Sequence, residues 1–332
     1  MSKEASGTRF VILAGKLGSG KTSLVEALLD ASDLASTTGV IVNEIGAINI
    51  DGAVLSQSAR GVAMATLSNG CVCCSLTNDL VTTVEELVAS RAQEALPPFE
   101  RIILECSGLS RPGQVMGSLA QLSQLGLRVQ IVSTYDCSRS PLGDDESDDA
   151  IAQLTAAHSI VLTKVDLVSP TRRAQAVEQV NAINPLARVV NEFSSTVRAR
   201  MAFRDADPQS VTIVPPVIGE PGQPRALLHP RIRVFRARFV NIPEWEQVLD
   251  WFENIAGATG DRLLRMKAIV AGPMGSDRVL IQSVGSTFAA PRRLASSDIH
   301  DMSAVFIVRD CAMAELEEVP TECDVRWTSL QN

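Results

Sequence analysis

The chain has 332 residues, of which 45% are hydrophobic and 20% are charged, and these values exclude a wholly disordered protein and predict about two domains. Its net charge of −8 and aromatic content of 4% argue against nucleic acid as a partner. No stretch reaches the roughly 18 apolar residues of a membrane helix and no secretory signal is visible, so we expect a cytoplasmic protein that does not bind membranes.

Residues 1–205 alternate short apolar strands with helical segments. We predict strands at 9–14, 40–43, 101–105, 129–134, 159–163 and 188–190. Between them, segment 78–92 places Leu80, Val84, Leu87 and Val88 on one helical face. Alternating strands and helices predict an α/β fold with a mostly parallel sheet flanked by helices.

Residues 206–230 are rich in proline and glycine and are predicted to be a linker. Residues 231–332 then predict a smaller α+β domain. Its expected elements are a strand at 231–239, a helix at 243–255, strands at 263–270, 278–285 and 304–309, and a short acidic helix near 312–319. The acidic run at 144–149 is expected to be a solvated loop of the first domain.

The clearest motif is GKLGSGKT, which follows the first predicted strand and opens a helix. This is the G-x-x-x-x-G-K-[ST] pattern of a phosphate-binding loop, in which backbone N–H groups surround phosphate oxygens. A lysine at this position neutralises phosphate, and the hydroxyl after it ligates Mg²⁺. The residues predicted to hold the nucleotide phosphates and Mg²⁺ are Gly15, Gly18, Ser19, Gly20, Lys21, Thr22 (Mg²⁺) and Ser23.

Two further strand ends carry polar groups that suit a nucleotide site. The strand at 101–105 ends in Glu105, a candidate for orienting Mg²⁺ or water, and Gly108 could place an N–H near the γ-phosphate. The strand at 159–163 is followed by Lys164 and Asp166; the carboxylate could accept two hydrogen bonds from guanine, while the lysine stem packs on the base. Taken alone, each is also compatible with an ordinary solvated strand end.

Three cysteines, Cys71, Cys73 and Cys74, lie within four residues. Three thiolates can supply three corners of a tetrahedral zinc site. Buried thiols or a strained Cys73–Cys74 disulfide are the alternatives. A fourth ligand has to come from elsewhere, and Glu44 is a candidate.

In this order, GKLGSGKT, VNEIGAINIDG, NGCVCCSL, ECSGL and TKVDL resemble the CobW family of metal-handling GTPases, relatives of the accessory GTPases that mature urease and hydrogenase. In the second domain LLRMKAIV, VLIQSVGS and AVFIV are similar to the C-terminal domain of that family. The resemblance therefore spans nearly the whole chain. It implies a P-loop GTPase fold, with GTP and Mg²⁺ as cofactors and Zn²⁺ or Co²⁺ as the bound metal.

The resemblance also assigns residues. It implies that Lys21 and Glu105 act in hydrolysis, that Asp166 recognises guanine, and that Glu44 and Asp51 lie near metal or Mg²⁺. Two positions depart from the family: Thr163 stands where guanine-binding motifs usually have Asn, and Lys16 matches an extra lysine of a class of dimeric ATPases. Base preference and a possible homodimer therefore stay open.

The resulting hypothesis is a Mg²⁺-dependent GTPase that binds a transition metal and delivers it to a client metalloprotein. Intrinsic turnover is expected to be slow, since no cis arginine finger is recognisable in the sequence. The alternatives are a nucleotide-gated regulator with structural zinc and a small-molecule kinase that uses the same phosphate loop.

Overall fold

The computed structural model of the chain describes residues 7–30, 32–43, 63–67, 76–119, 125–140, 142, 148–204, 229–275, 277–294 and 302–331. It divides into two compact units. The first comprises 1–140, 147–177 and 188–204, and the second comprises 141–146, 178–187 and 205–332. Among the described residues, no helix has both the length and the apolar character needed to cross a membrane.

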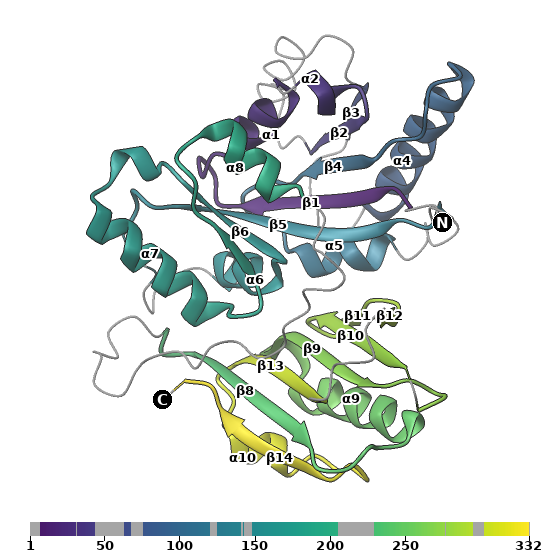
Figure 1. The fold of residues 1–332 in the computed structure, drawn as a ribbon, viewed down its shortest axis with the longest axis vertical. Coiled ribbons are helices and arrows are strands. Elements are labelled where there is room, and N and C mark those ends of the chain that lie inside the picture. The colour runs from purple at the N-terminus through teal and green to yellow at the C-terminus, as the bar shows by residue number, and fades with distance from the viewer. Residues whose placement is uncertain are drawn as a thin grey trace. The chain divides into compact units, whose positions relative to one another are not determined.

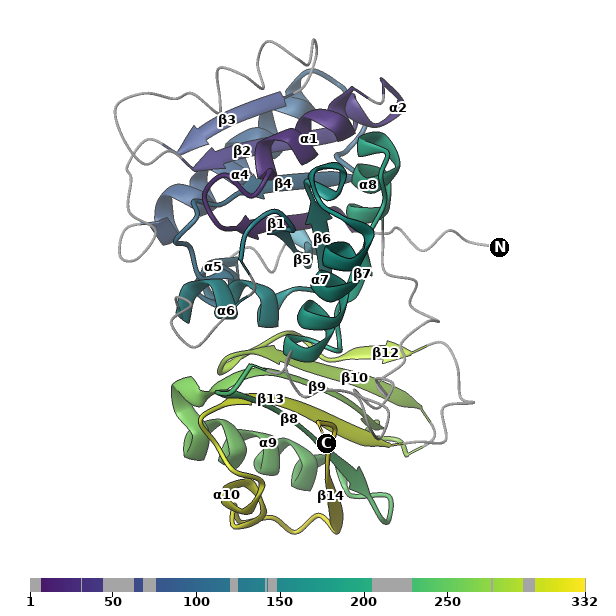
Figure 2. The same ribbon diagram turned by 90° about the vertical axis from the view of Figure 1, so that its left-hand side faces the viewer.

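The first unit is built on a seven-stranded parallel sheet (Figures 1 and 2). Its strands are β1 Arg9–Gly15, β2 Thr38–Asn43, β3 Ala63–Leu67, β4 Arg101–Glu105, β5 Arg128–Asp136, β6 Ser159–Thr163 and β7 Arg188–Val190. They are ordered β3-β2-β4-β1-β5-β6-β7. Every residue of β4 and β6 is buried, because helices cover both faces of the sheet. The predicted α/β architecture is confirmed.

Helices of the first unit pack on opposite faces of this sheet (Figure 2). They are α1 Lys21–Leu29, α2 Ser32–Ala35, α4 Leu76–Gln93, α5 Pro112–Leu119, α6 Asp148–Ala156, α7 Pro170–Ile183 and α8 Ser195–Ala202, with a 3-10 turn at Val165–Leu167. The division into units assigns residues 178–183 of α7 to the second unit. Helices α1 and α8 share one hydrophobic cluster with alternate residues of β1. Helix α4 covers the other face of β2, where Gly39 leaves room for Leu87: a Cβ at Gly39 would lie 2.9 Å from that side chain.

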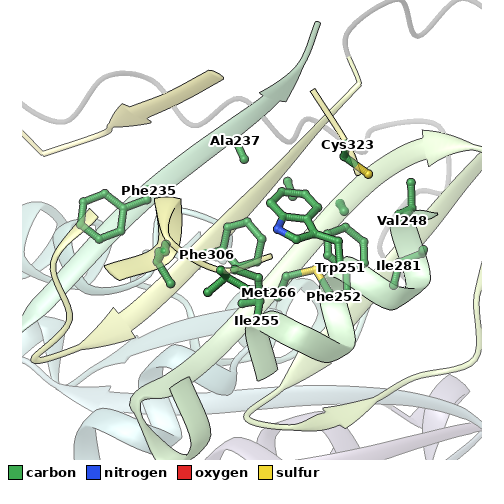
Figure 3. Close-up of a cluster of buried hydrophobic side chains, with 14 of the residues drawn as sticks. Phe235, Ala237, Val248, Trp251, Phe252, Ile255, Met266, Ile281, Phe306 and Cys323 are labelled. Atoms are coloured by element: carbon green, nitrogen blue, oxygen red, sulfur yellow. The ribbon is translucent and has the colours of Figure 1, made fainter. Parts of the chain in front are cut away.

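The second unit is an antiparallel sheet with α9 packed on one face (Figures 1 and 3). Its elements are β8 Ile232–Phe239, α9 Trp245–Thr259, β9 Leu263–Ala271, β10 Arg278–Val284, β11 Thr287–Phe288, β12 Arg292–Leu294, β13 Ser303–Arg309, α10 Met313–Glu317 and β14 Val325–Ser329. The sheet order is β11-β10-β9-β13-β8-β14, with β12 paired to β10. This confirms the smaller α+β domain.

Trp251 of α9 centres the core of the second unit and has no exposed surface (Figure 3). Its ring meets Phe239, Phe306 and Trp327 in edge-to-face geometry, with centroid separations of 5.6, 5.9 and 5.9 Å. Such aromatic pairs contribute roughly 0.5–1.5 kcal/mol each beyond the area they bury. This cluster holds α9 against the sheet.

Two parts of the structure differ from the sequence-based expectations. Asp148 and Asp149, expected in a solvated loop, form the first turn of α6, where carboxylates interact favourably with the helix dipole. Strands β3, β11, β12 and β14 were not predicted. Strand β3 has only five residues, two of them alanine, which give a weak strand pattern, and β11 and β12 have only two and three residues. Residues 205–228, most of the predicted linker, lie outside the described residues.

Candidate functional site

The loop between β1 and α1 turns tightly, and Ser19 N donates to Lys16 O within it at 3.1 Å. Gly15, Gly18 and Gly20 have φ angles of 144°, 72° and 88°, values that L side chains rarely adopt. A Cβ at Gly15 would lie 2.1 Å from Thr134 Oγ1, so a side chain is also excluded sterically. The glycines of the predicted phosphate loop are therefore required by backbone geometry and close packing.

Lys21 begins α1 and is almost fully buried beneath this loop. Its Nζ donates to Gly15 O at 2.9 Å and to Lys16 O at 3.2 Å. These bonds hold the ammonium group along the inside of the loop, as expected for a group that neutralises bound phosphate. Ser23, in the first turn of the same helix, is exposed.

Thr22 and Glu105, predicted from separate motifs, meet in the structure. Thr22 Oγ1 donates to Glu105 Oε1 at 2.7 Å, although 83 residues separate them. Glu105 is 3% exposed at the end of β4. A hydroxyl and a carboxylate are oxygen ligands of the kind that Mg²⁺ prefers, so this pair fits a magnesium ion shared with nucleotide phosphates.

Hydroxyl groups tie the phosphate loop to two neighbouring strands. Ser19 Oγ lies 2.6 Å from Thr134 Oγ1 on β5. Thr163 Oγ1, at the end of β6, donates to Ser19 O at 2.8 Å, and Tyr135 O lies 3.2 Å away. The side chain that replaces the usual asparagine thus fixes the distance between the phosphate loop and the strand that leads to Asp166.

Lys164 and Asp166 follow β6 in a 3-10 turn, and Lys164 has a φ of 53°. Lys164 Nζ donates to Asp136 Oδ2 at 2.7 Å. Asp166 is exposed. Burial lowers the pKa of the nearby Arg198, and the negative charge of Asp166 opposes this lowering. Arg198 also donates to Leu162 O and Phe193 O at 3.3 Å each, so this guanidinium connects β6 to the loop that follows β7.

Gly108 lies against the tip of the phosphate loop. A Cβ on it would come within 2.6 Å of Leu17 N. The loop that carries Gly108 is held by Gln153 of α6, which is 1% exposed and donates to Gly108 O at 2.9 Å and Ser110 O at 3.0 Å. Cys106 is buried beside Glu105, and this burial raises the pKa of its thiol to about 12, so it stays protonated.

The predicted transition-metal ligands fall outside the described residues. They are Glu44, Cys71, Cys73 and Cys74, together with Asp51 as a Mg²⁺ candidate. Within the described part of the chain, no three His, Cys, Asp or Glu side chains are grouped so that they could hold a metal.

Asp136, Arg139 and Gln153 were not predicted from the sequence. Asp136 ends β5 in parallel register with Thr163, so a carboxylate at a strand end was the available signal. No sequence pattern indicated a role for Arg139 or Gln153, because arginines in surface loops and glutamines in helices are common in proteins of all kinds.

The chain matches the family model "CobW/HypB/UreG, nucleotide-binding domain" over residues 9–191, and "Cobalamin synthesis protein cobW C-terminal domain" over residues 232–323. The Schizosaccharomyces pombe protein named "Zinc-regulated GTPase metalloprotein activator 1" is 28% identical over 187 residues, which are 54% of this chain and 44% of that protein. The Escherichia coli "Zinc chaperone YjiA" is 27% identical over 184 residues, 54% of this chain and 57% of that protein. The matches thus span about half the length of these curated relatives.

Among solved structures, that of Zn(II)-bound YjiA GTPase from E. coli aligns with a TM-score of 0.66 and 18% identity, covering 94% of this chain and 98% of the other. At this identity the alignment shows a shared fold. The first family model alone spans more than half of the chain, from β1 to the strand that follows α7. The chain therefore belongs to the CobW/HypB/UreG family of nucleotide-binding proteins and carries a CobW C-terminal domain.

Proposed function

We propose that this protein is a Mg²⁺-dependent GTPase that binds a transition metal, zinc or cobalt, as cargo and delivers it to a client metalloprotein. The observation that carries the nucleotide part is the meeting of Thr22 with Glu105 beside Lys21 and the glycine loop. Mg²⁺, held by Thr22 and Glu105, would neutralise charge on the β- and γ-phosphates.

In this proposal each residue of the site has a separate task. The N–H groups of Gly18 to Lys21 and the Lys21 ammonium bind phosphate oxygens. Glu105 orients the attacking water or the hydrated metal, and the N–H of Gly108 approaches the γ-phosphate. Because catalysis consists of positioning and charge neutralisation, turnover without a further cation is expected to be slow.

Guanine would be recognised at the end of β6. The exposed Asp166 carboxylate can accept from both N1–H and N2–H of guanine, whereas adenine offers no matching pair of donors. The aliphatic stem of Lys164 would lie on the base while its ammonium remains paired with Asp136.

The sequence order supports a coupling between nucleotide and metal. Cys71, Cys73 and Cys74 lie between the phosphate loop and Glu105, in the interval where nucleotide-binding proteins place segments that γ-phosphate orders. Thiolates suit zinc or cobalt, and the relatives named above are zinc chaperones or zinc-regulated GTPases. A difference of about 1.4 kcal/mol between the two nucleotide states would change metal affinity tenfold.

The test is Zn²⁺ affinity measured by competition with a chromophoric chelator in Mg·GTP, Mg·GDP and nucleotide-free protein. We expect about tenfold or larger differences between the GTP and GDP states. Cys73→Ser should remove most zinc binding, whereas Lys21→Ala should keep zinc binding but lose its dependence on nucleotide. Equal affinities in all three states would refute release by hydrolysis.

A further inference from the structure

Asp136 is a buried carboxylate that joins two loops of the nucleotide site. It ends β5 and is only 3% exposed. Its Oδ1 accepts from Ser138 N at 2.9 Å and from Ser138 Oγ at 2.6 Å. Its Oδ2 accepts from Lys164 Nζ at 2.7 Å and lies 3.4 Å from Arg139 Nε. Burial raises the pKa of Asp136, but the hydrogen bonds from Lys164 and Ser138 outweigh it and lower the pKa below its ordinary value.

Arg139 reaches from this carboxylate to the phosphate loop. While its Nε faces Asp136, its terminal NH2 group donates to Leu17 O at 2.5 Å. A Cβ at Gly18 would lie 3.5 Å from the same NH2 group, which places the guanidinium directly against the loop tip. Arg172 in turn donates to Arg139 O at 2.8 Å, which fixes the backbone from which the arginine extends.

The loop tip is thus held from both sides. Gly108 packs against Leu17 N, and Arg139 binds Leu17 O. Leu17 itself has a side chain that is 81% exposed, so its own packing contributes little to its position. The backbone at Leu17 and Gly18 belongs to the segment whose N–H groups would surround phosphate oxygens, and its position therefore affects their geometry.

We propose that Arg139 is a positioning residue that ties the phosphate loop to the base-recognition turn through the shared carboxylate of Asp136. Lys164, at the base, and Arg139, at the phosphates, bind the same oxygen, Asp136 Oδ2. A guanidinium suits this task because its planar fork donates in two directions at once, which an ammonium cannot do with the same geometry. The inference rests on the proposed GTPase activity for its catalytic consequence, whereas the tether itself can be measured without nucleotide.

The tether is tested by hydrogen exchange of the nucleotide-free protein. Arg139→Ala should speed amide exchange in the peptide that contains residues 16–20 by about fivefold or more, because the loop loses its constraint from the β5 side. Arg231→Ala is the matched control, since Arg231 is also half-exposed and ion-paired, with Asp310, in the other unit. Unchanged exchange in Arg139→Ala would overturn the proposal whatever the enzyme's activity.

The catalytic consequence is tested by GTP hydrolysis. Arg139→Ala should lower kcat about tenfold while KM for GTP changes less than about threefold, because the base contacts remain but the phosphates are misplaced. Millimolar guanidinium should partly restore kcat in Arg139→Ala and leave Arg231→Ala unchanged. Asp136→Asn should lower kcat at least as much and should also raise KM for GTP, because it weakens the contact with Lys164 as well. The double variant should be no worse than Asp136→Asn, because Arg139 acts through Asp136.

The two measurements separate the possible failures. If the wild-type protein hydrolyses no GTP but Arg139→Ala loosens residues 16–20, the proposed function is wrong and the tether stands. If exchange quickens while kcat in an active enzyme stays unchanged, the tether exists but does not position catalytic groups, and the proposal is refuted.

Discussion

The Thr163 hydroxyl makes one of the contacts that connect β6 to the phosphate loop. The amide of an asparagine would have bridged several backbone groups at this position, but a threonine hydroxyl has one proton to donate. That proton goes to Ser19 O, which keeps the phosphate loop beside the end of β6. In the proposed function, base selection is then left to Asp166, the carboxylate of the 3-10 turn that follows.

Asp166→Asn should invert the donor and acceptor pattern offered to the base. An amide can donate to the O2 atom of xanthine, whereas it cannot accept both guanine protons, so we expect GTP affinity to fall at least about tenfold and xanthosine triphosphate to bind better than GTP. Affinity is measured by fluorescence titration with both nucleotides. Asp250→Asn, an exposed change on α9, should alter neither. An unchanged GTP affinity in Asp166→Asn would exclude Asp166 from base recognition.

At the scale of elements, the carboxyl ends of three strands contact the phosphate loop that follows β1. Gly108, in the loop after β4, packs against the phosphate loop, and Arg139, in the loop after β5, donates a hydrogen bond to it. Thr163, the last residue of β6, donates its hydroxyl proton to Ser19 O. This is the arrangement expected where the carboxyl ends of parallel strands meet at one edge of a sheet. Gln153 of α6 holds the loop after β4 by donating to Gly108 O and Ser110 O, so the position of α6 affects the geometry of the site.

Gly108→Ala should damage the site without unfolding the protein. The added Cβ would lie 2.6 Å from Leu17 N, so the phosphate loop has to shift. We expect GTP turnover to fall about tenfold or more, since misplacement by about an ångström has that order of effect. Gly117→Ala is the control: nothing lies within 4 Å of the position that a Cβ would take there, and alanine in α5 should stabilise the helix by about 0.5–1 kcal/mol. Equal turnover in both variants would contradict this account.

At the scale of the whole molecule, the second unit carries positive charges on its strands and negative charges on its helices. Strands β8, β9, β10, β12, β13 and β14 contain arginine, β9 also contains a lysine, and none of them contains a carboxylate. Helices α9 and α10 contain carboxylates and no arginine or lysine. Met266 and Ala268 face the core beneath α9, so Lys267 lies on the opposite face of the sheet. Burial lowers the pKa of Lys267 to about 8, and the positive charges of Arg265 and Arg292 contribute to this lowering.

Lys267 should therefore make the second unit more stable as pH rises. An unfolded lysine titrates near pH 10.4, so between about pH 8 and 10.4 the unfolded chain binds the extra proton and stability increases with pH. Lys267→Met should raise the free energy of unfolding at pH 7 by about 1–3 kcal/mol and flatten this rise. All three tryptophans, Trp245, Trp251 and Trp327, belong to this unit, so their fluorescence during urea unfolding monitors it alone. An equally steep pH dependence in the variant would contradict the assignment.

The sequence by itself determined the elements whose signals are local. Strands at 101–105, 159–163 and 188–190 have the predicted bounds because short apolar runs, each followed by polar residues, define buried parallel strands. The phosphate loop was equally readable, since its glycines and lysine are consecutive and each meets a local backbone need. These features also sufficed to suggest the family, which the matches over residues 9–191 and 232–323 confirm.

Tertiary structure decided which distant residues became neighbours. Thr22 and Glu105 were predicted separately, and only the adjacency of β1 and β4 brings them within 2.7 Å. Asp136 and Arg139 acquired their importance from the pairing of β5 with β1 and β6, which no local pattern encodes. The reason is physical: a hydrogen bond depends on ångström distances between atoms, and strand order, rather than sequence spacing, sets those distances across a parallel sheet.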